Sequence, residues 1–101
     1  MVAGRMVETL GHRPNPVEVM PNGVLAELRK LYYDTASASS PTSIAALRMM
    51  APVSQILFGS DYPFVNTAMG IEELSHTELS DSERRAIDSG NALALFPRLR
   101  V

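Results

Sequence analysis

Two apolar segments joined by a proline-initiated helix constrain the fold of this chain more than any other feature. Residues 31–36 (LYYDTA) are rich in aromatic and β-branched side chains, and residues 55–59 (QILFG) form a continuous apolar run typical of a strand buried on both faces. Between them, Ser40 and Pro41 suit the cap and the first turn of a helix, which Pro52 ends. A strand, a helix and a strand form a βαβ unit, so we expect an α/β fold with two parallel strands.

Helices are expected on both sides of this unit. Apolar residues at spacing four predict a helix over residues 1–11, and three prolines predict a loop from His12 to Gly23. Asn22 is the expected cap of a short helix that carries Val24, Leu25 and Leu28.

The C-terminal part should be helical only from its capping box onward. An irregular stretch containing Gly70 is expected after Phe64. Ser80 and Glu83 have the spacing of a capping box, and the helix that they open should end near Gly90. Asn91 would then cap a last amphipathic turn that stops at Pro97. Arg84 and Arg85 are expected on a solvated face of the helix.

Length, charge and cysteine content exclude several classes of protein. The 101 residues are enough for one small domain, taken here as residues 1–101. A net charge of −2 argues against nucleic acid or an anionic membrane as a partner. The absence of cysteine excludes disulfides and thiol catalysis, and no apolar run approaches the roughly 20 residues that span a bilayer. The default expectation is a cytoplasmic protein.

Asp61 is the candidate catalytic residue. It follows the apolar strand directly within ILFGSDYPF, residues 56–64, and Pro63 prevents that strand from continuing. In parallel α/β folds the carboxyl ends of strands carry the catalytic groups, where a carboxylate can bind a metal or act as a general base. The alternative is that Asp61 is a loop acid that hydrogen-bonds nearby backbone amides before a proline turn.

Other titratable residues are weaker candidates. Asp34 lies within the first expected strand, where a charge is costly unless an arginine or a backbone donor pairs with it. His12 and His76 have no second ligand at metal-binding spacing, so both are interpreted as surface histidines.

The segments LYYDTA, SQILFGSDYPF and RRAIDSGNALALFPRL together resemble the C-terminal third of the amidohydrolase-related proteins, and more narrowly the branch that contains aminocarboxymuconate-semialdehyde decarboxylase. The resemblance covers most of residues 24–99. It implies a (β/α)₈ barrel (TIM barrel) with a divalent metal, usually zinc, in which residues 31–36 and 55–59 are the seventh and eighth strands. Asp61 matches the aspartate that ends the eighth strand and serves the metal-dependent reaction, a hydrolysis or a decarboxylation of a small carboxylic acid or cyclic substrate.

The resemblance leaves two hypotheses open. Because the family's histidine ligands would precede Met1, the chain would be the last two β/α units of a partial barrel, with Asp61 as its surviving metal and catalytic residue. Such a chain is expected to bind divalent metal weakly and to be inactive alone, which leaves its standing as an enzyme undecided. The alternative is a non-catalytic α/β module that pairs through exposed strand edges with another copy or another chain. A homo-oligomer is expected in either case, because so short a chain has little core.

Overall fold

A computed structural model describes residues 22–100 of the chain, which divides into residues 1–31 and residues 32–101. Within the first part, the expected short helix is confirmed as α3, Val24–Leu28. Asn22 is not its cap, because Gly23 occupies the N-cap position and no side-chain hydrogen bond caps the helix. Gly23 has φ 86°, a backbone conformation that residues other than glycine rarely adopt. The helix predicted over residues 1–11 lies outside the described residues, as does most of the predicted loop, including His12.

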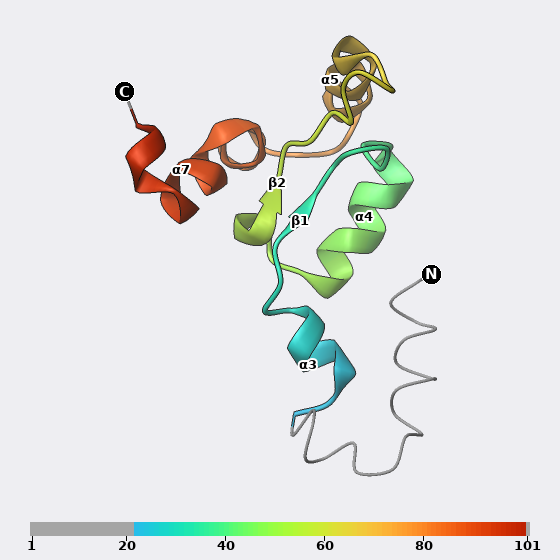
Figure 1. Cartoon of the computed structure of the whole chain (residues 1–101). Coiled ribbons are helices and arrows are strands. Elements are labelled where there is room, and N and C mark those ends of the chain that lie inside the picture. Colours follow the sequence, from blue (N-terminus) through green and yellow to red (C-terminus); the bar gives the residue numbers. More distant parts are fainter. Residues whose placement is uncertain (1–21, 101) are drawn as a thin grey trace. The chain divides into compact units, whose positions relative to one another are not determined.

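The second part contains the predicted βαβ unit. Strand β1 (Tyr33–Asp34), helix α4 (Pro41–Met50) and strand β2 (Ile56–Leu57) follow one another, and a 3₁₀ turn, η1 (Val53–Gln55), precedes β2. The strands form a two-stranded parallel sheet in which Tyr33 pairs with Ile56 and Asp34 with Leu57 (Figure 1). The parallel pairing is confirmed, although the strands are shorter than the apolar segments that contain them.

Helix α4 begins as its sequence predicts. The Ser40 hydroxyl accepts a hydrogen bond from the Ser43 amide at 3.3 Å, and Pro41 occupies the first helical position. Ile44 on this helix is fully buried, as is Ile56 on β2, and Ile87 is 1% exposed. These three isoleucines are the largest fully buried side chains among the described residues. Ile44 and Ile56 therefore bury apolar surface on both the helix and the second strand of the βαβ unit.

Helix α5 (Thr67–Ser75) contradicts the irregular stretch expected after Phe64. The Asn66 side chain caps it by accepting a hydrogen bond from the Ala68 amide at 2.9 Å. Leu74 is buried, and this tertiary contact outweighs the helix-weakening effect of Gly70, which is only about 1 kcal/mol. The capping box expected after it is confirmed in α6 (Asp81–Arg85), where Ser80 and Glu83 exchange both hydrogen bonds.

The predicted helix end at Gly90 is wrong. The chain continues from α6 through a π-helical segment, η2 (Ala86–Gly90), into α7 (Asn91–Leu95), and then into a 3₁₀ turn, η3 (Pro97–Leu99). Gly90 has helical dihedrals, φ −59° and ψ −44°. Asn91 is therefore not a cap: it is buried, and its side-chain amide donates to the carbonyl oxygens of Val53 and Ile56, each at 2.7 Å.

The outer edge of β2 is bonded to this C-terminal helical segment. In addition to the bond from Asn91 to the Ile56 carbonyl, the Phe58 amide donates to the carbonyl of Ile87 at 2.9 Å. Figure 1 shows α7 on the opposite side of β2 from β1. This edge is accordingly less open to another strand than the sequence suggested.

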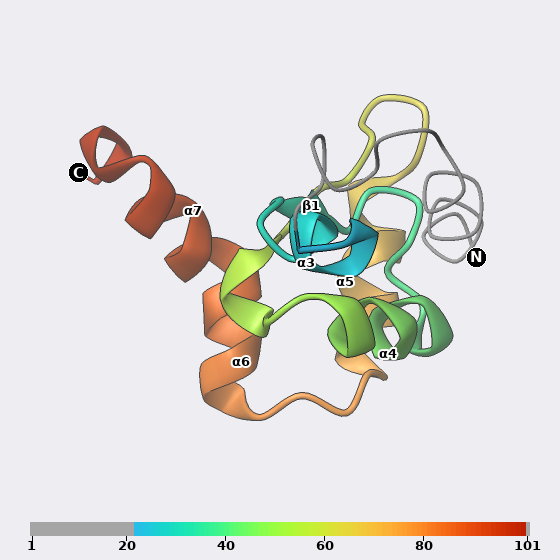
Figure 2. The same cartoon turned by 90° about the horizontal axis from the view of Figure 1, so that it is seen from below.

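An arginine joins α4 to the connection between α5 and α6. Arg48 donates to the Glu78 carbonyl at 3.1 Å and to the Glu83 carboxylate at 2.6 Å, and Figure 2 shows this connection passing beside α4. Arg84 was expected on a solvated face but is half-buried, donating to the carbonyls of Leu74 and Thr77. Across residues 22–100, no helix has the length and apolar character to cross a membrane.

Candidate functional site

Thr35 and Gly59 tie together the carboxyl ends of the two strands. Thr35 is 1% exposed, and its hydroxyl oxygen lies 3.2 Å from the Gly59 carbonyl oxygen, to which it donates, and 3.1 Å from the Gly59 amide, from which it accepts. A Cβ added at Gly59 would lie 3.0 Å from the carboxyl carbon of Asp34. The loops that follow β1 and β2 are therefore held side by side at the end where parallel sheets place their active sites.

Asp61 meets Ser37 across these two loops. The Ser37 hydroxyl donates to a carboxylate oxygen of Asp61 at 3.3 Å, and both residues are exposed. Both also have left-handed backbone conformations, with φ 54° at Ser37 and φ 58° at Asp61, which are uncommon for residues other than glycine. Backbone conformations of this kind cost free energy and are concentrated at functional sites. Ser37 and Asp61 are therefore candidate functional residues.

The loop-acid interpretation of Asp61 is not what the structure shows. Its backbone carbonyl, rather than its carboxylate, accepts from the amides of Phe64 and Val65 in the following turn. The Ser60 hydroxyl accepts from the Tyr62 amide at 3.3 Å and so supplies the side-chain bond that holds the turn. The Asp61 carboxylate is left facing Ser37, where it can accept further donors.

Asp34 has the structural role foreseen for it. One of its carboxylate oxygens accepts from the Ala36 amide at 2.9 Å, a local turn in which a backbone donor pairs with the acid. The side chain is exposed rather than buried in the strand. Asp34 therefore stabilises the loop that leads to Ser37, and no chemistry is assigned to it.

A cleft of about 220 Å³ opens beside this pair, between the strand ends and α5. Val65 and Met69 are its apolar members, and Glu73 is its one charged member among the described residues. The Ser39 hydroxyl donates to the Glu73 carboxylate at 2.5 Å. The remaining lining residues are Thr35, Ser37, Ser39, Gly59, Ser60 and Gly70.

Sequence reasoning missed Ser39 and Glu73. The two residues are 34 positions apart, and Glu73 lies on a helix that was not predicted. The serines at positions 37, 39 and 40 lie close together in the sequence, but nothing in their spacing indicates which acid they approach. Only the packing of α5 across the strand ends brings the pair together.

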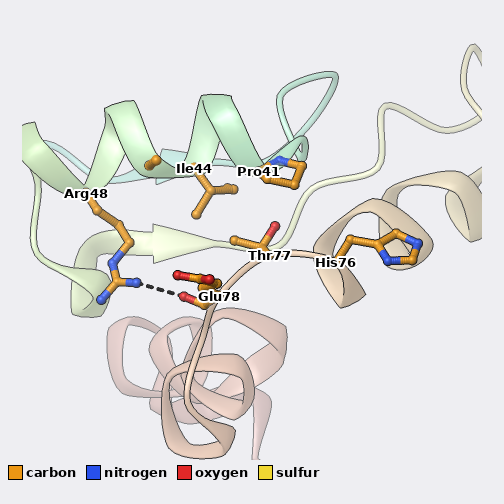
Figure 3. Close-up of a pocket in the computed structure, with 7 residues that line it drawn as sticks. Pro41, Ile44, Arg48, His76, Thr77 and Glu78 are labelled. Atoms are coloured by element: carbon orange, nitrogen blue, oxygen red, sulfur yellow. Dashed lines mark hydrogen bonds between the residues drawn. The ribbon is translucent and has the colours of Figure 1, made fainter.

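A larger cleft of about 360 Å³ lies away from the strand ends, between α4 and the connection from α5 to α6 (Figure 3). His76, the C-cap residue that follows α5, is exposed here, in agreement with its interpretation as a surface histidine. Arg48 is already bonded to Glu78 and Glu83. We therefore assign this cleft a structural role, and we place the candidate site at the strand ends although its cleft is smaller.

The described residues do not by themselves fit a catalytic metal. In residues 22–100 no three histidine, cysteine, aspartate or glutamate side chains gather closely enough to hold an ion. A catalytic zinc centre normally takes three protein ligands and leaves one position open. Asp61 could supply one such ligand.

Comparison with known proteins decides the family. A sequence profile of the amidohydrolase family matches residues 5–98. The chain belongs to the amidohydrolase family. It is 34% identical over 96 residues to a 6-methylsalicylic acid decarboxylase of Penicillium expansum, a match that covers 86% of this chain and 28% of that protein. It is 35% identical over 77 residues to the 6-methylsalicylic acid decarboxylase acuB of Aspergillus aculeatus, covering 68% of this chain and 22% of that protein.

Two solved decarboxylase structures resemble this chain in fold. A dihydroxybenzoic acid decarboxylase of Polaromonas sp. JS666, with bound manganese and the inhibitor 2-nitroresorcinol, superposes with a TM-score of 0.73 at 20% identity, over 96% of this chain and 30% of that one. A 2,6-dihydroxybenzoate decarboxylase from Rhizobium gives the same TM-score and identity, over 93% of this chain and 31% of that one. These likenesses concern the fold. The chain spans less than a third of the length of each of these four relatives.

Proposed function

We propose that this chain forms the C-terminal third of a metal-dependent decarboxylase that acts on an aromatic carboxylic acid, with Asp61 as an active-site carboxylate. The observation that supports the proposal most is the position of Asp61. It follows β2 directly, has a left-handed backbone conformation, and turns its carboxylate toward Ser37 rather than into its own turn. The decarboxylase relatives favour decarboxylation over hydrolysis, the two reactions left open by the sequence.

In this proposal β1 and β2 are the seventh and eighth strands of a TIM barrel. The short parallel pair and its connecting helix are compatible with two adjacent β/α units, whose carboxyl ends point to the active-site face. Asp61 then contributes one carboxylate to a centre completed by residues outside positions 22–100. A divalent metal suits the proposal because a structural relative binds manganese, and zinc remains the alternative metal.

Metal binding provides the first test. We expect the 101-residue chain to bind Mn²⁺ and Zn²⁺ only weakly in calorimetry and to release no CO₂ from 6-methylsalicylate, because a lone carboxylate cannot hold a metal against water. A longer polypeptide that begins upstream of Met1 should bind metal stoichiometrically and release CO₂. Asp61→Asn in that polypeptide should abolish both properties.

The matched control is Asp81→Asn, which alters an exposed aspartate in the first turn of α6. It should leave metal binding and CO₂ release unchanged. The proposal fails if the longer polypeptide decarboxylates 6-methylsalicylate equally well with Asn at position 61. Tight metal binding by the 101-residue chain that is lost in Asp61→Asn would show instead that a centre assembles without other segments.

A further inference from the structure

The cleft at the strand ends accepts hydrogen bonds and carries negative charge. Its polar side chains are four hydroxyls and the Glu73 carboxylate, with the Asp61 carboxylate beside it on Ser37. None of the described residues that line it carries a positive charge. A ligand carboxylate placed here would face uncompensated negative charge, whereas a neutral group with an O–H to donate would find an acceptor.

Glu73 is held in place for such a donor. Ser39 is 4% exposed, and its hydroxyl fixes one carboxylate oxygen of Glu73 at 2.5 Å. Among the described residues no hydrogen bond to the other carboxylate oxygen is present. Because α5 is capped by Asn66 and anchored by the buried Leu74, Glu73 projects from a defined position beside the strand ends.

The size and walls of the cleft suit one aromatic ring. An engineered cavity of about 150 Å³ is enough to bind benzene in another protein. The cleft here measures about 220 Å³, which leaves room for ring substituents. Val65 and Met69 provide apolar contact for a ring face, and the methionine sulfur favours aromatic neighbours.

We propose that this cleft binds the hydroxyl-bearing edge of a neutral phenolic ring and that Glu73, held by Ser39, is the residue that selects a hydroxyl over a carboxylate there. The inference rests on the proposed function for its biological meaning: a hydroxylated aromatic acid would place its neutral hydroxyl against Glu73 and keep its carboxylate outside the cleft. The carboxylate would then lie toward the residues outside positions 22–100 that complete the centre. Binding in the cleft itself needs no turnover and no metal.

Three small probes separate hydrogen-bond donation, ring contact and charge. Resorcinol donates two hydrogen bonds, its dimethyl ether keeps the ring but donates none, and benzoate is negatively charged. In an NMR titration of the 101-residue chain without metal, resorcinol should shift the amide signals of Gly59, Ser60 and Gly70. Both other probes should bind at least about tenfold more weakly, the difference expected for losing one hydrogen bond to a charged group.

Two variants test the assigned residues. Glu73→Gln keeps the size of the side chain and removes its charge, so resorcinol should bind about tenfold more weakly and the preference over benzoate should shrink. Ser39→Ala should weaken resorcinol binding less, because it loosens Glu73 without removing it. Glu72→Gln, one residue away on α5, is the matched control and should change neither affinity. An unchanged amide spectrum at Ile87 establishes that each variant is folded.

Each outcome decides the inference. It is overturned if benzoate or the dimethyl ether binds as well as resorcinol, if Glu73→Gln leaves the preference unchanged, or if none of the probes binds at millimolar concentration. The proposed function is tested separately by CO₂ release from the longer polypeptide. A selective phenol site in a polypeptide that does not decarboxylate would contradict the proposed function alone, and turnover without selectivity would contradict this inference alone.

Discussion

Gly59 occupies the point of closest approach between the two strand ends. A Cβ there would lie 3.0 Å from both the carboxyl carbon and one carboxylate oxygen of Asp34. The exposed Asp34 carboxyl group would have to move by a few tenths of an ångström, which would strain its 2.9 Å bond from the Ala36 amide. We expect Gly59→Ala to destabilise the chain by about 1 kcal/mol, the low end of the range for overpacking, because the Asp34 side chain is exposed and can shift. The midpoint of urea unfolding measures this loss.

Gly70→Ala is the matched control for Gly59→Ala. Its added Cβ would have an ordinary contact, 3.8 Å from the Ser39 hydroxyl oxygen, within helix α5. Alanine is favoured over glycine inside a helix by about 1 kcal/mol, so the unfolding midpoint should rise. Equal midpoints for both variants would show that the space beside Asp34 is not limiting.

Single residues were predictable where their role is local. Asp61 could be found because it directly follows an apolar strand, and the pairing of Asp34 with a backbone donor follows from the habits of aspartate in turns. The partnership of Ser39 with Glu73 spans 34 residues and depends on where α5 lies, so no local pattern reveals it. The same holds for Asn91, whose position after a glycine imitates a cap although its amide bonds two distant carbonyls.

At the scale of elements, an ion pair between Arg48 on α4 and Glu83 links α4 to the capping box of α6. The Ser80 amide donates to the Glu83 carboxylate and, as the largest cause, lowers the pKa of Glu83 below its ordinary value of 4.5; the Ser80 hydroxyl and Arg48 act in the same direction. A carboxyl whose pKa is lower in the folded state stabilises that state above its unfolded pKa. This contribution is lost as pH falls through the folded pKa.

We therefore expect the chain to lose stability below about pH 4.5 more steeply than its Glu83→Gln variant. Glu83 is partly exposed to solvent, so the difference should be small and should shrink in high salt. Urea unfolding midpoints at neutral and acidic pH measure it. Glu72→Gln, which alters an exposed glutamate outside the capping box, should follow the wild-type pH dependence. Parallel curves for wild type and Glu83→Gln would contradict the prediction.

Helices and strands were predictable where local residues, such as helix caps, mark their ends. Ser40 with Pro41, and Ser80 with Glu83, begin helices whose caps have the predicted bonds. Helix α5 escaped prediction because Gly70 interrupts its pattern and because it is held largely by the burial of Leu74 and by its Asn66 cap. The strands are shorter than expected because their ends are taken up by the turn at Asp34 and by the bond from Phe58 to Ile87.

At the scale of the whole chain, one of the two strand edges that the sequence offered for self-association is occupied. The outer edge of β2 is already hydrogen-bonded to Ile87 and Asn91, which leaves it a poor template for a strand of another copy. Several large apolar side chains are exposed on the segment after β2 instead: Tyr62 is 76% exposed, Phe64 87% and Ile71 56%. Exposed apolar patches on a small chain mark sites of association.

We expect the 101-residue chain to form a dimer or larger homo-oligomer through the exposed side chains of Tyr62, Phe64 and Ile71, none of which lines the cleft at the strand ends, because covering them removes apolar surface from water. Static light scattering over a range of concentrations should give a mass above 11.0 kDa. Phe64→Ser should shift the equilibrium toward the monomer. Met49→Ser is the matched control: Met49 is 85% exposed but lies on α4, so its loss should leave the mass unchanged. A folded chain that stays monomeric at high concentration would exclude self-association, whereas an oligomer indifferent to Phe64→Ser would place its interface on another surface.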